Sequence, residues 1–256
     1  MSAAQATTIG AAEAGGVFTK GLRWRGKRVP YITRWTAESV PQPRVVRRVT
    51  LAGEGIGFED EDPRTDRRYG VLHIRSALAP GRCEPEFHLV NPHRQRRAME
   101  HSLCQVCSGP TVGTRADGRT LFLLGGAHPI AEGETTAAPP VHPPCAIEAV
   151  ENCPPLGRGY AVALVERATL YGVAGVIHDP KTLAPLPHVG SRPGELAHVD
   201  IASAVSPWTL ASFTVVSLHG VTSVSPDELH AMAEEVSEPS AYHDSVGGAG
   251  AAATSL

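Results

Sequence analysis

The chain has 256 residues, of which 42% are hydrophobic and 19% charged, so it is long enough to bury the core of one large domain or two small ones. It contains no run of about 18 apolar residues that would predict a membrane span, and the opening MSAAQATTIGAAEAGG lacks the basic and apolar segments of a secretory signal. Five cysteines in a chain of this length argue against a disulfide framework, so we expect a cytoplasmic protein without a membrane partner.

Charge is distributed unevenly along the chain. Residues 1–103 contain 17 Lys and Arg against 11 Asp and Glu, the remainder contains 6 against 15, and the net charge is −3. A basic N-terminal half favours a nucleic-acid or acidic protein partner. Codon bias is the alternative explanation: only three of the 23 basic residues are Lys, and many Arg, Ala, Gly and Pro residues are typical of a GC-rich bacterial genome.

The N-terminal part is expected to be rich in short strands. Residues 1–19 are small and polar and predict a disordered arm, and the region 20–90 contains strand-forming stretches at 44–53 and 70–78. The run EDEDPRTDRR at 59–68 predicts a charged loop without the acid spacing of a calcium site. With 26 Gly and 22 Pro, turns should be frequent, so the expected fold class is α+β, with short antiparallel strands and a few helices.

A short helix is predicted at 91–103, where the central region 91–156 begins. Asn91 is a suitable N-cap, and Pro92 fits the first helical position. The helix contains Arg94, Arg96 and Arg97, which we expect to face an anionic partner. Nucleic acid is the first candidate, because Arg contacts to phosphate are sequence-tolerant, and an acidic protein is the second.

Further strands and helices are predicted after residue 119. A buried strand is expected at 120–126, and strands at 159–166 and 171–178 are expected to pair as a hairpin. In 206–220 the β-branched run favours a strand, but Pro207 near the start and Gly220 at the end favour a helix, which is the preferred interpretation. Ser225 and Glu228 predict the capping box of a helix at 225–236. The elements after residue 157 belong to an α+β region at 157–238. Residues 239–256 are a second predicted disordered segment.

Cysteine and histidine spacing in the central region predicts a metal site. Cys104 and Cys107 form a C-x2-C pair, and His142 and Cys145 form an H-x2-C pair further along the chain. A C-x2-C turn lets two thiolates converge on one ion, and the second pair completes the tetrahedron that Zn²⁺ prefers. Because four protein ligands leave no open position, we expect a structural zinc rather than a catalytic one.

Alternatives to this ligand set stay open. Cys153, at the end of the expected helix after Cys145, is a substitute ligand if His142 turns away. Cys83 is expected to be a lone thiol. The alternative without a metal is that the cysteines are reduced core residues beside an incidental histidine, since cysteine is often buried without binding a metal.

The central region resembles the treble-clef zinc finger, in which a knuckle and a hairpin precede a ligand pair at a helix N-terminus. CQVCSGP supplies the knuckle, TLFLLGG a strand, and PPCAIEAVEN the helix. RRAMEHSLCQVCSG is also similar to the opening of HNH-type nucleases, and AHPI, with His128, falls where their first strand carries histidines. No carboxylate stands beside His128, and ENCPPLGRGY does not supply the pair of Asn and His that a working metal site needs, so this resemblance implies at most a degenerate HNH-like nuclease.

The wider pattern, from RWRGKRVPYITRW through CQVC and PPCAIEAV to PWTLASFTVVS, resembles proteins of GC-rich actinobacteria and their mobile elements that carry no assigned activity. The main hypothesis is a zinc-binding protein that acts as a nucleic-acid or protein interaction module. The alternative is an enzyme of accessory or secondary metabolism with a pocket beside the zinc region, for which Arg94, Arg97 and His128 are the first residues to inspect. No catalytic residues and no oligomeric state are predicted.

Overall fold

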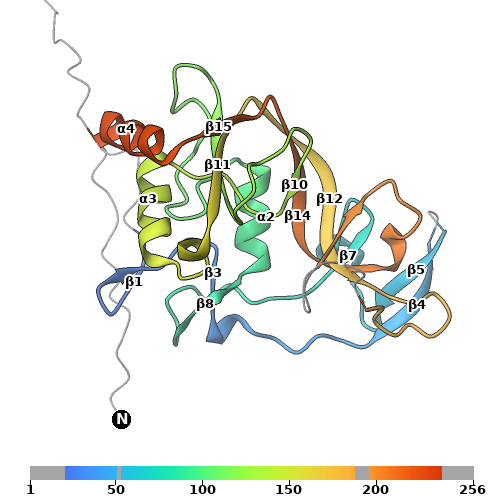
Figure 1. Ribbon diagram of the computed structural model, residues 1–256. Coiled ribbons are helices and arrows are strands. Elements are labelled where there is room, and N and C mark those ends of the chain that lie inside the picture. Colours follow the sequence, from blue (N-terminus) through green and yellow to red (C-terminus); the bar gives the residue numbers. More distant parts are fainter. Residues whose placement is uncertain (1–20, 51–52, 188–195, 238–256) are drawn as a thin grey trace, which may run out of the picture.

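A computed structural model describes residues 21–50, 53–187 and 196–237; the arm predicted at 1–19 and the tail predicted at 239–256 lie outside these ranges. Within them the fold is α+β, as predicted, with many short and mostly antiparallel strands (Figure 1). The described helices are α1 Pro63–Asp66, α2 Pro92–Glu100, α3 Pro143–Asn152 and α4 Pro226–Ser237.

The predicted caps of two helices are confirmed. Asn91 accepts hydrogen bonds from two backbone N–H groups in the first turn of α2, at 3.0 and 3.1 Å. At the start of α4 the hydroxyl of Ser225 accepts from the N–H of Glu228 (3.3 Å), and the Glu228 carboxylate accepts from the N–H of Ser225 (2.7 Å). These reciprocal bonds satisfy N–H groups that a helix terminus otherwise leaves without partners.

The larger sheet has strand order β13-β12-β14-β7-β6, with β10 added beside β14. β14 is its central strand, antiparallel to β12 and β10 and parallel to β7. The strands are β6 Arg67–Arg68, β7 Val71–His73, β10 Thr135–Thr136, β12 Arg167–Ile177, β13 Ala197–Asp200 and β14 Thr209–His219.

The smaller sheet has strand order β15-β11-β9. Its strands are β9 Thr120–Gly125, β11 Tyr160–Val165 and β15 Thr222–Val224, and all its pairings are antiparallel. Both sheets combine strands from more than one of the regions proposed from the sequence (20–90, 91–156 and 157–238), so those boundaries stay a prediction.

One long bent ribbon of two antiparallel segments, β11–β12 and β14–β15, joins the two sheets. β11 and β12 are separated only by Glu166, and they pair with β15 and β14 respectively. At the bend the N–H of Glu166 donates to the carbonyl of His219 (3.1 Å). Gly220 has a φ of +66°, and a Cβ there would lie 2.6 Å from the Glu166 side chain. A glycine is therefore needed where the ribbon passes from one sheet to the other.

Two predictions for this ribbon are wrong. The stretches 159–166 and 171–178 do not form a hairpin with each other, because 167–170 continue strand β12 instead of turning. Residues 209–219 form strand β14 rather than a helix, preceded only by the 3-10 turn η3 Ser206–Trp208. The β-branched side chains of β14 pack well between two neighbouring strands, and this tertiary setting outweighs the local helix-capping signals.

Smaller strand pairs extend from the two sheets. The pairs are β1 Arg23–Trp24 with β2 Lys27–Arg28, β3 Thr33–Trp35 with β8 Pro85–Val90, and β4 Val45–Thr50 with β5 Gly53–Phe58. The strand predicted at 44–53 is thus present, whereas the one predicted at 70–78 is confined to β7. Short 3-10 turns also occur at η1 Thr36–Glu38 and η2 Leu156–Arg158.

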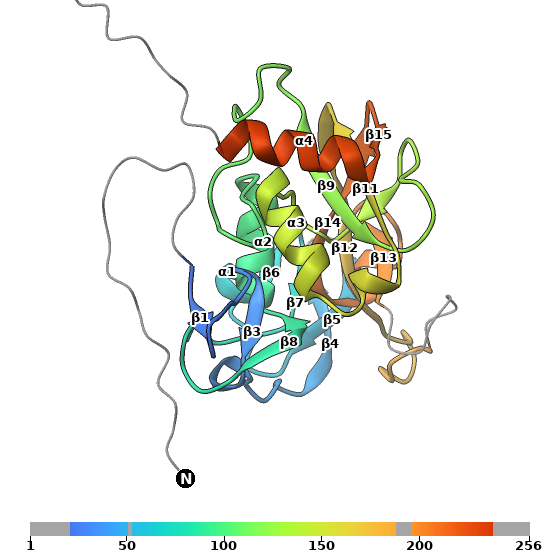
Figure 2. The same ribbon diagram turned by 60° about the vertical axis from the view of Figure 1, so that its left-hand side comes forward.

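Side chains alternate across the smaller sheet and pack on both of its faces. Leu121 and Leu123 join a core cluster that includes Leu229 of α4 and residues of α3, whereas Phe122 packs with Met99 of α2. Figure 2 shows α3 and α4 lying across the sheet on the first of these faces. The cysteines of the predicted metal site belong to the same cluster, so the site lies in the core between a sheet and two helices.

Candidate metal centre

Four side chains meet at one point in this core. The Sγ atoms of Cys104, Cys107 and Cys145 and a ring nitrogen of His142 all lie within 4.8 Å of one another, and all four residues are buried. Zinc bonds of about 2.0–2.3 Å in a tetrahedron separate the ligand atoms by roughly 3.3–3.8 Å, so the cluster is the right size for one ion. The structure thus brings together all four residues that the spacing singled out.

The first pair lies on a tight turn. The N–H of Cys104 donates to the carbonyl of Gly109 (2.8 Å), and the N–H of Ser108 donates to the carbonyl of Cys104 (2.9 Å). Ser108 has a φ of +62°, which reverses the chain directly after Cys107. The N–H of Gly109 then points at the Sγ of Cys107, at 3.4 Å. A backbone N–H aimed at sulfur favours the thiolate form, which is the form that binds a metal.

The second pair, His142 and Cys145, is positioned by the start of α3 and by a backbone contact with the turn at 104–107. His142 is the N-cap of α3, which begins at Pro143, and Cys145 lies in its first turn. The backbone before them is fixed at both sides, because the N–H of Gln105 donates to the carbonyl of Pro140 (2.9 Å) and the N–H of Val141 donates to the carbonyl of Leu121 (2.9 Å). The partial positive charge of a helix N-terminus stabilises a nearby thiolate.

The ring of His142 is oriented for ligation through Nδ1. This nitrogen lies 3.2 Å from the Sγ of Cys107, inside the cluster. The other ring nitrogen, Nε2, lies 2.8 Å from the carbonyl oxygen of Pro110, so Nε2 carries the proton and donates it. Metal-binding histidines commonly donate their second N–H to a carbonyl in this way, which fixes both the tautomer and the ring direction.

Without a metal, Cys104, His142 and Cys145 compete for protons. Burial opposes ionisation of Cys104, but hydrogen bonds with Cys107, Cys145 and His142 outweigh it and hold the pKa of that thiol well below its usual range. Burial likewise opposes protonation of His142, yet hydrogen bonds with Cys104 and Cys107 raise its pKa to about 10. The hydrogen bonds of Cys145 with Cys104 and Cys107, together with burial, raise the pKa of the Cys145 thiol. A divalent cation would replace the shared protons and satisfy all four groups at once.

A cationic side chain lies beside the cluster. The Nη1 atom of Arg28 is 4.0 Å from the Sγ of Cys145 and 2.9 Å from the carboxylate of Glu148 on α3. Three thiolates and a neutral imidazole around a divalent ion would carry a net charge of about −1, which the guanidinium would offset. The sequence did not single out Arg28, because nothing in RWRGKR distinguishes it from its three basic neighbours.

The two remaining cysteines lie outside the cluster. Cys153 is the C-cap of α3, and about 12 Å of helix separates it from Cys145. The cluster therefore contains His142 and not the substitute ligand Cys153. Cys83 is an exposed thiol, and all five cysteines are free of disulfides.

The three arginines of α2 do not share one surface. Arg94 is buried and forms an ion pair with Glu38, and Arg96 is buried and donates to the carbonyl of Ser212 (3.2 Å). Only Arg97 is exposed. The expectation that all three face an anionic partner does not fit the placement of Arg94 and Arg96, whose guanidinium groups are directed into the protein.

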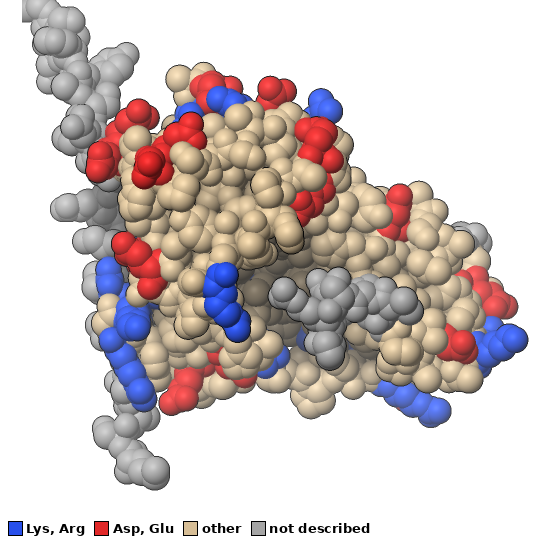
Figure 3. Space-filling model, in the orientation of Figure 1, with Lys and Arg blue, Asp and Glu red and all other residues tan. Residues whose placement is uncertain are grey.

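Exposed basic side chains gather elsewhere, on the β1–β2 hairpin. Arg23, Arg25 and Lys27 are exposed there, and the Arg25 guanidinium lies 5.8 Å from the ring centroid of Trp24. Figure 3 shows Lys and Arg side chains at the edge of the molecule where β1 lies, and acidic side chains over α4.

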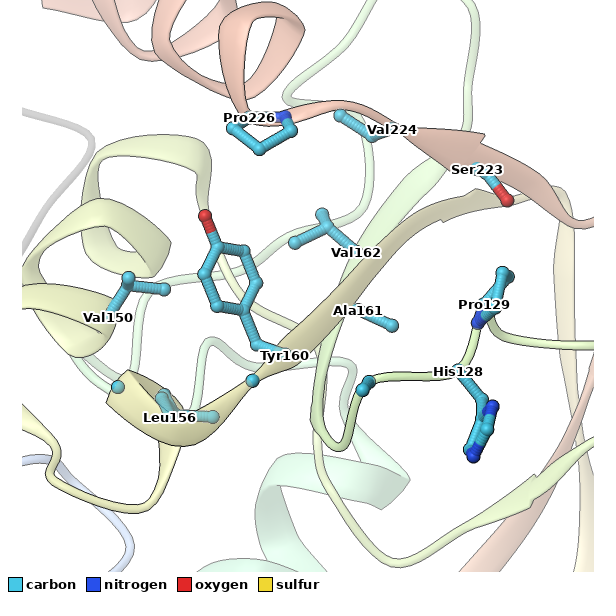
Figure 4. Close-up of a pocket in the computed structure, with 13 residues that line it drawn as sticks. His128, Pro129, Val150, Leu156, Tyr160, Ala161, Val162, Ser223, Val224 and Pro226 are labelled. Carbon is cyan, nitrogen blue, oxygen red and sulfur yellow. The ribbon is translucent and has the colours of Figure 1, made fainter.

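A groove of about 590 Å³ lies beside α3 and strands β11 and β15 of the smaller sheet and contains the predicted candidate His128. Its lining is mainly apolar and includes Val150 of α3, Leu156 and Val162. In Figure 4 the imidazole of His128 and the hydroxyl of Tyr160 point in different directions. An enzyme site needs polar groups that converge on one position, and these do not converge.

No protein-family model matches this sequence, and comparisons with curated proteins and with solved structures find no match either. The knuckle and the helix N-terminus of a treble clef are both present, but β9 pairs with β11 and β10 pairs with β14, so these two strands do not form the hairpin between the ligand pairs. The likeness to treble-clef and HNH-type proteins therefore stays a prediction. None of the described helices is long and apolar enough to cross a membrane.

Proposed function

We propose that Cys104, Cys107, His142 and Cys145 bind one Zn²⁺ ion and that this ion is structural. The observation that carries the proposal is the meeting of four buried ligand atoms within 4.8 Å of one another. Three sulfurs and one nitrogen suit Zn²⁺ rather than Mg²⁺ or Ca²⁺, which prefer oxygen ligands. A complete set of four leaves no position for water or substrate, which favours a structural role over a degenerate HNH-like nuclease.

The proposed ion would hold together segments that are far apart in the sequence. The knuckle at 104–107 also contacts the N-terminal segment, because the N–H of Tyr31 donates to the carbonyl of Val106 (3.0 Å). The second ligand pair begins α3, which packs against α4. Without the ion, three thiol groups and an imidazole would remain crowded in the core, so removing it should destabilise this whole part of the protein.

The test is a pair of cysteine variants treated in parallel. We expect Cys104→Ser to lose the metal and to unfold the centre of the chain, and a strong chelator to have the same effect on the unmodified protein. Cys83→Ser is the matched control, because that thiol is exposed and outside the cluster. Thermal unfolding followed by circular dichroism measures both effects. An unfolding temperature that is unchanged by chelator and by Cys104→Ser would contradict a structural metal.

We further propose that the protein is an interaction module whose partner is anionic, with nucleic acid first, and that β1–β2 supplies the contact surface. Arg23, Arg25 and Lys27 are exposed on this hairpin beside Trp24, an arrangement suited to phosphate contacts and base stacking. Arg28 connects the hairpin to the proposed zinc centre through Glu148. Five cysteines without disulfides support a reducing, cytoplasmic setting.

Gel retardation tests this surface. At low salt we expect weak, sequence-tolerant binding that falls steeply as salt is raised, since released counterions drive phosphate binding. Arg25→Glu should abolish binding, whereas Arg82→Glu, the same charge change at another exposed arginine, should only weaken it. No retardation at about 50 mM salt, where phosphate contacts are weakly screened, would exclude a nucleic-acid partner.

A further inference from the structure

The β4–β5 hairpin has one open edge. Among the described residues β4 and β5 pair only with each other. The N–H of Glu59 donates to the carbonyl of Arg44 (3.0 Å), and in this register the backbone N–H and C=O groups of Val45, Arg47 and Val49 point away from β5. These outward groups form no backbone hydrogen bond within the part of the chain that the structure describes. An exposed row of this kind is a template for another strand.

The opposite edge of the hairpin, along β5, is already occupied. The carbonyl of Ile56 accepts from the guanidinium of Arg67 (2.7 Å), and the carbonyl of Phe58 accepts from the N–H of Glu61 (3.2 Å). β5 also contacts η3. Figure 1 shows the hairpin at the end of the molecule remote from α3 and α4. β4 is therefore the edge of this hairpin that is open to another strand.

The side chains of β4 do not oppose strand pairing. Val49 is 75% exposed, the largest exposed fraction of any large hydrophobic side chain in the described residues, so it lacks apolar cover. Edge strands are commonly protected by a charged side chain. Arg47 does not act in this way, because its guanidinium is directed back over the hairpin, where it binds Glu54 of β5 (3.0 Å) and lies 5.5 Å from the ring centroid of Trp208. The charge of Arg47 is thus balanced within one copy of the chain.

We propose that β4 is a homodimer interface, in which the β4 strands of two copies pair antiparallel about a two-fold axis at Arg47. In this register Val49 of each copy lies opposite Val45 of the other, so both exposed valines gain an apolar neighbour. A shift of two residues in either direction would leave Val45 or Val49 outside the paired region.

This pairing would complete the backbone of both copies. About six backbone hydrogen bonds would form between the two β4 strands, and two isolated hairpins would become one four-stranded sheet, which is more stable than a pair of strands alone. The inference is independent of the zinc and nucleic-acid proposals, because β4 contributes neither a metal ligand nor a residue of the β1–β2 hairpin.

Sedimentation velocity over a concentration series tests the dimer. The unmodified protein should pass from monomer to dimer in the micromolar to millimolar range, because one strand per copy makes a small interface of the transient class. Val49→Lys, which places a charge on the open edge, should weaken the dimer by about tenfold or more. Val112→Lys is the matched control and should dimerise like the unmodified protein, because Val112 is 64% exposed but lies outside β4.

Cysteine cross-linking tests the register. Opposite residues of a hydrogen-bonded antiparallel pair have Cα atoms about 5.5 Å apart, which suits a disulfide. In a Cys83→Ser background with oxidised glutathione as oxidant, Arg47→Cys should therefore give a cross-linked dimer. Val49→Cys should not, since the two copies of position 49 would lie more than about 13 Å apart.

Three results would overturn the proposal: a monomer at every concentration, a dimer that Val49→Lys leaves intact, or equal cross-linking of Arg47→Cys and Val49→Cys. In the first case the edge of β4 stays open or pairs with a different chain.

Discussion

Arg94 and Glu38 form a doubly hydrogen-bonded ion pair in the interior, although 56 residues separate them in the chain. One oxygen of Glu38 lies 2.7 Å from Nη2 of Arg94, and the other bonds to Nη1. Glu38 also accepts from the N–H groups of Trp35 (2.9 Å) and Ala79 (3.0 Å). Arg94 in turn donates from Nε to the carbonyl of Tyr31 (2.6 Å). The pair thus fastens the N-terminal segment to α2 and serves the fold rather than an external partner.

Removing one member of this pair should be strongly destabilising. In Glu38→Ala the buried Arg94 guanidinium would lose its carboxylate, so we expect the free energy of unfolding to fall by about 3–5 kcal/mol. Chemical denaturation measures the change. The control is Glu54→Ala, which removes one member of the exposed pair with Arg47 and should cost less than about 1 kcal/mol. If the free energy of unfolding falls equally in the two variants, the buried pair does not stabilise the fold more than an exposed pair does.

The buried His73 should make stability fall in acid. Its pKa is lowered to about 3 in the folded protein by burial and by Arg96, whereas the unfolded chain has the ordinary value near 6.5. Below pH 6.5 the unfolded state therefore binds a proton that the folded state does not, and the free energy of unfolding decreases as pH falls from 6.5 towards 3.

The variant His73→Gln should lower this slope by up to about 1.4 kcal/mol per pH unit. Urea denaturation at several pH values in a phosphate-free buffer measures it. His88→Gln, at an exposed position of β8, is the control and should leave the slope as it is. If His73→Gln and the unmodified protein have parallel pH profiles, the His73 ring is not kept neutral by the fold.

Arg28 should slow the release of the proposed zinc. Its guanidinium lies 4.0 Å from the Sγ of Cys145, where it offsets the negative charge of a three-thiolate centre. We expect Arg28→Met to weaken zinc affinity by about 10–100-fold, the usual size of such outer contacts, with the protein still folded. Competition for zinc with a coloured chelator measures the affinity, and the rate of zinc transfer to that chelator measures the release. Arg23→Met, on the same hairpin but exposed, should match the unmodified protein; a similar loss there would assign the effect to general surface charge.

Gly172 should tolerate no side chain. It faces Asp200 of β13 in the larger sheet, and an added Cβ would lie 1.9 Å from the carbonyl oxygen of Val199. Gly172→Ala must push two backbones apart, so we expect a loss of about 1–3 kcal/mol in stability. Gly157→Ala is the control, because no atom lies within 4 Å of a Cβ at that position. Equal melting temperatures for the two variants would contradict the close approach of β12 and β13.

Local sequence signals predicted what local interactions determine. The caps of α2 and α4 follow from Asn91 and Ser225, whose side chains bond to backbone only a few residues away. The cluster of cysteines and His142 could be predicted because metal chemistry limits both ligand type and spacing. In 206–220, however, the local signals predicted a helix that ends at Gly220. The positive φ of Gly220 instead bends the chain between the two sheets, and this role follows only from the pairing of β14 with β12.

The roles of the arginines could not be read from the sequence. Arg94 and Arg96 lie on a predicted basic helix, and nothing near them in the chain indicates burial. Arg94 is buried because Glu38 reaches it from a distant segment, and Arg96 because β7 and β14 pack over α2. Only Arg97, next to both, has the exposure that the pattern predicted for all three. Long-range contacts decided these positions, and single-sequence patterns carry no information about such contacts.

The most direct test is the metal content of the purified protein, measured by elemental analysis together with the protein concentration. The account predicts one zinc per chain in the unmodified protein and in Cys153→Ser, and none in Cys104→Ser. A folded protein that holds no zinc after expression in zinc-supplemented medium would contradict the structural centre, and two metal ions per chain would contradict the purely structural role.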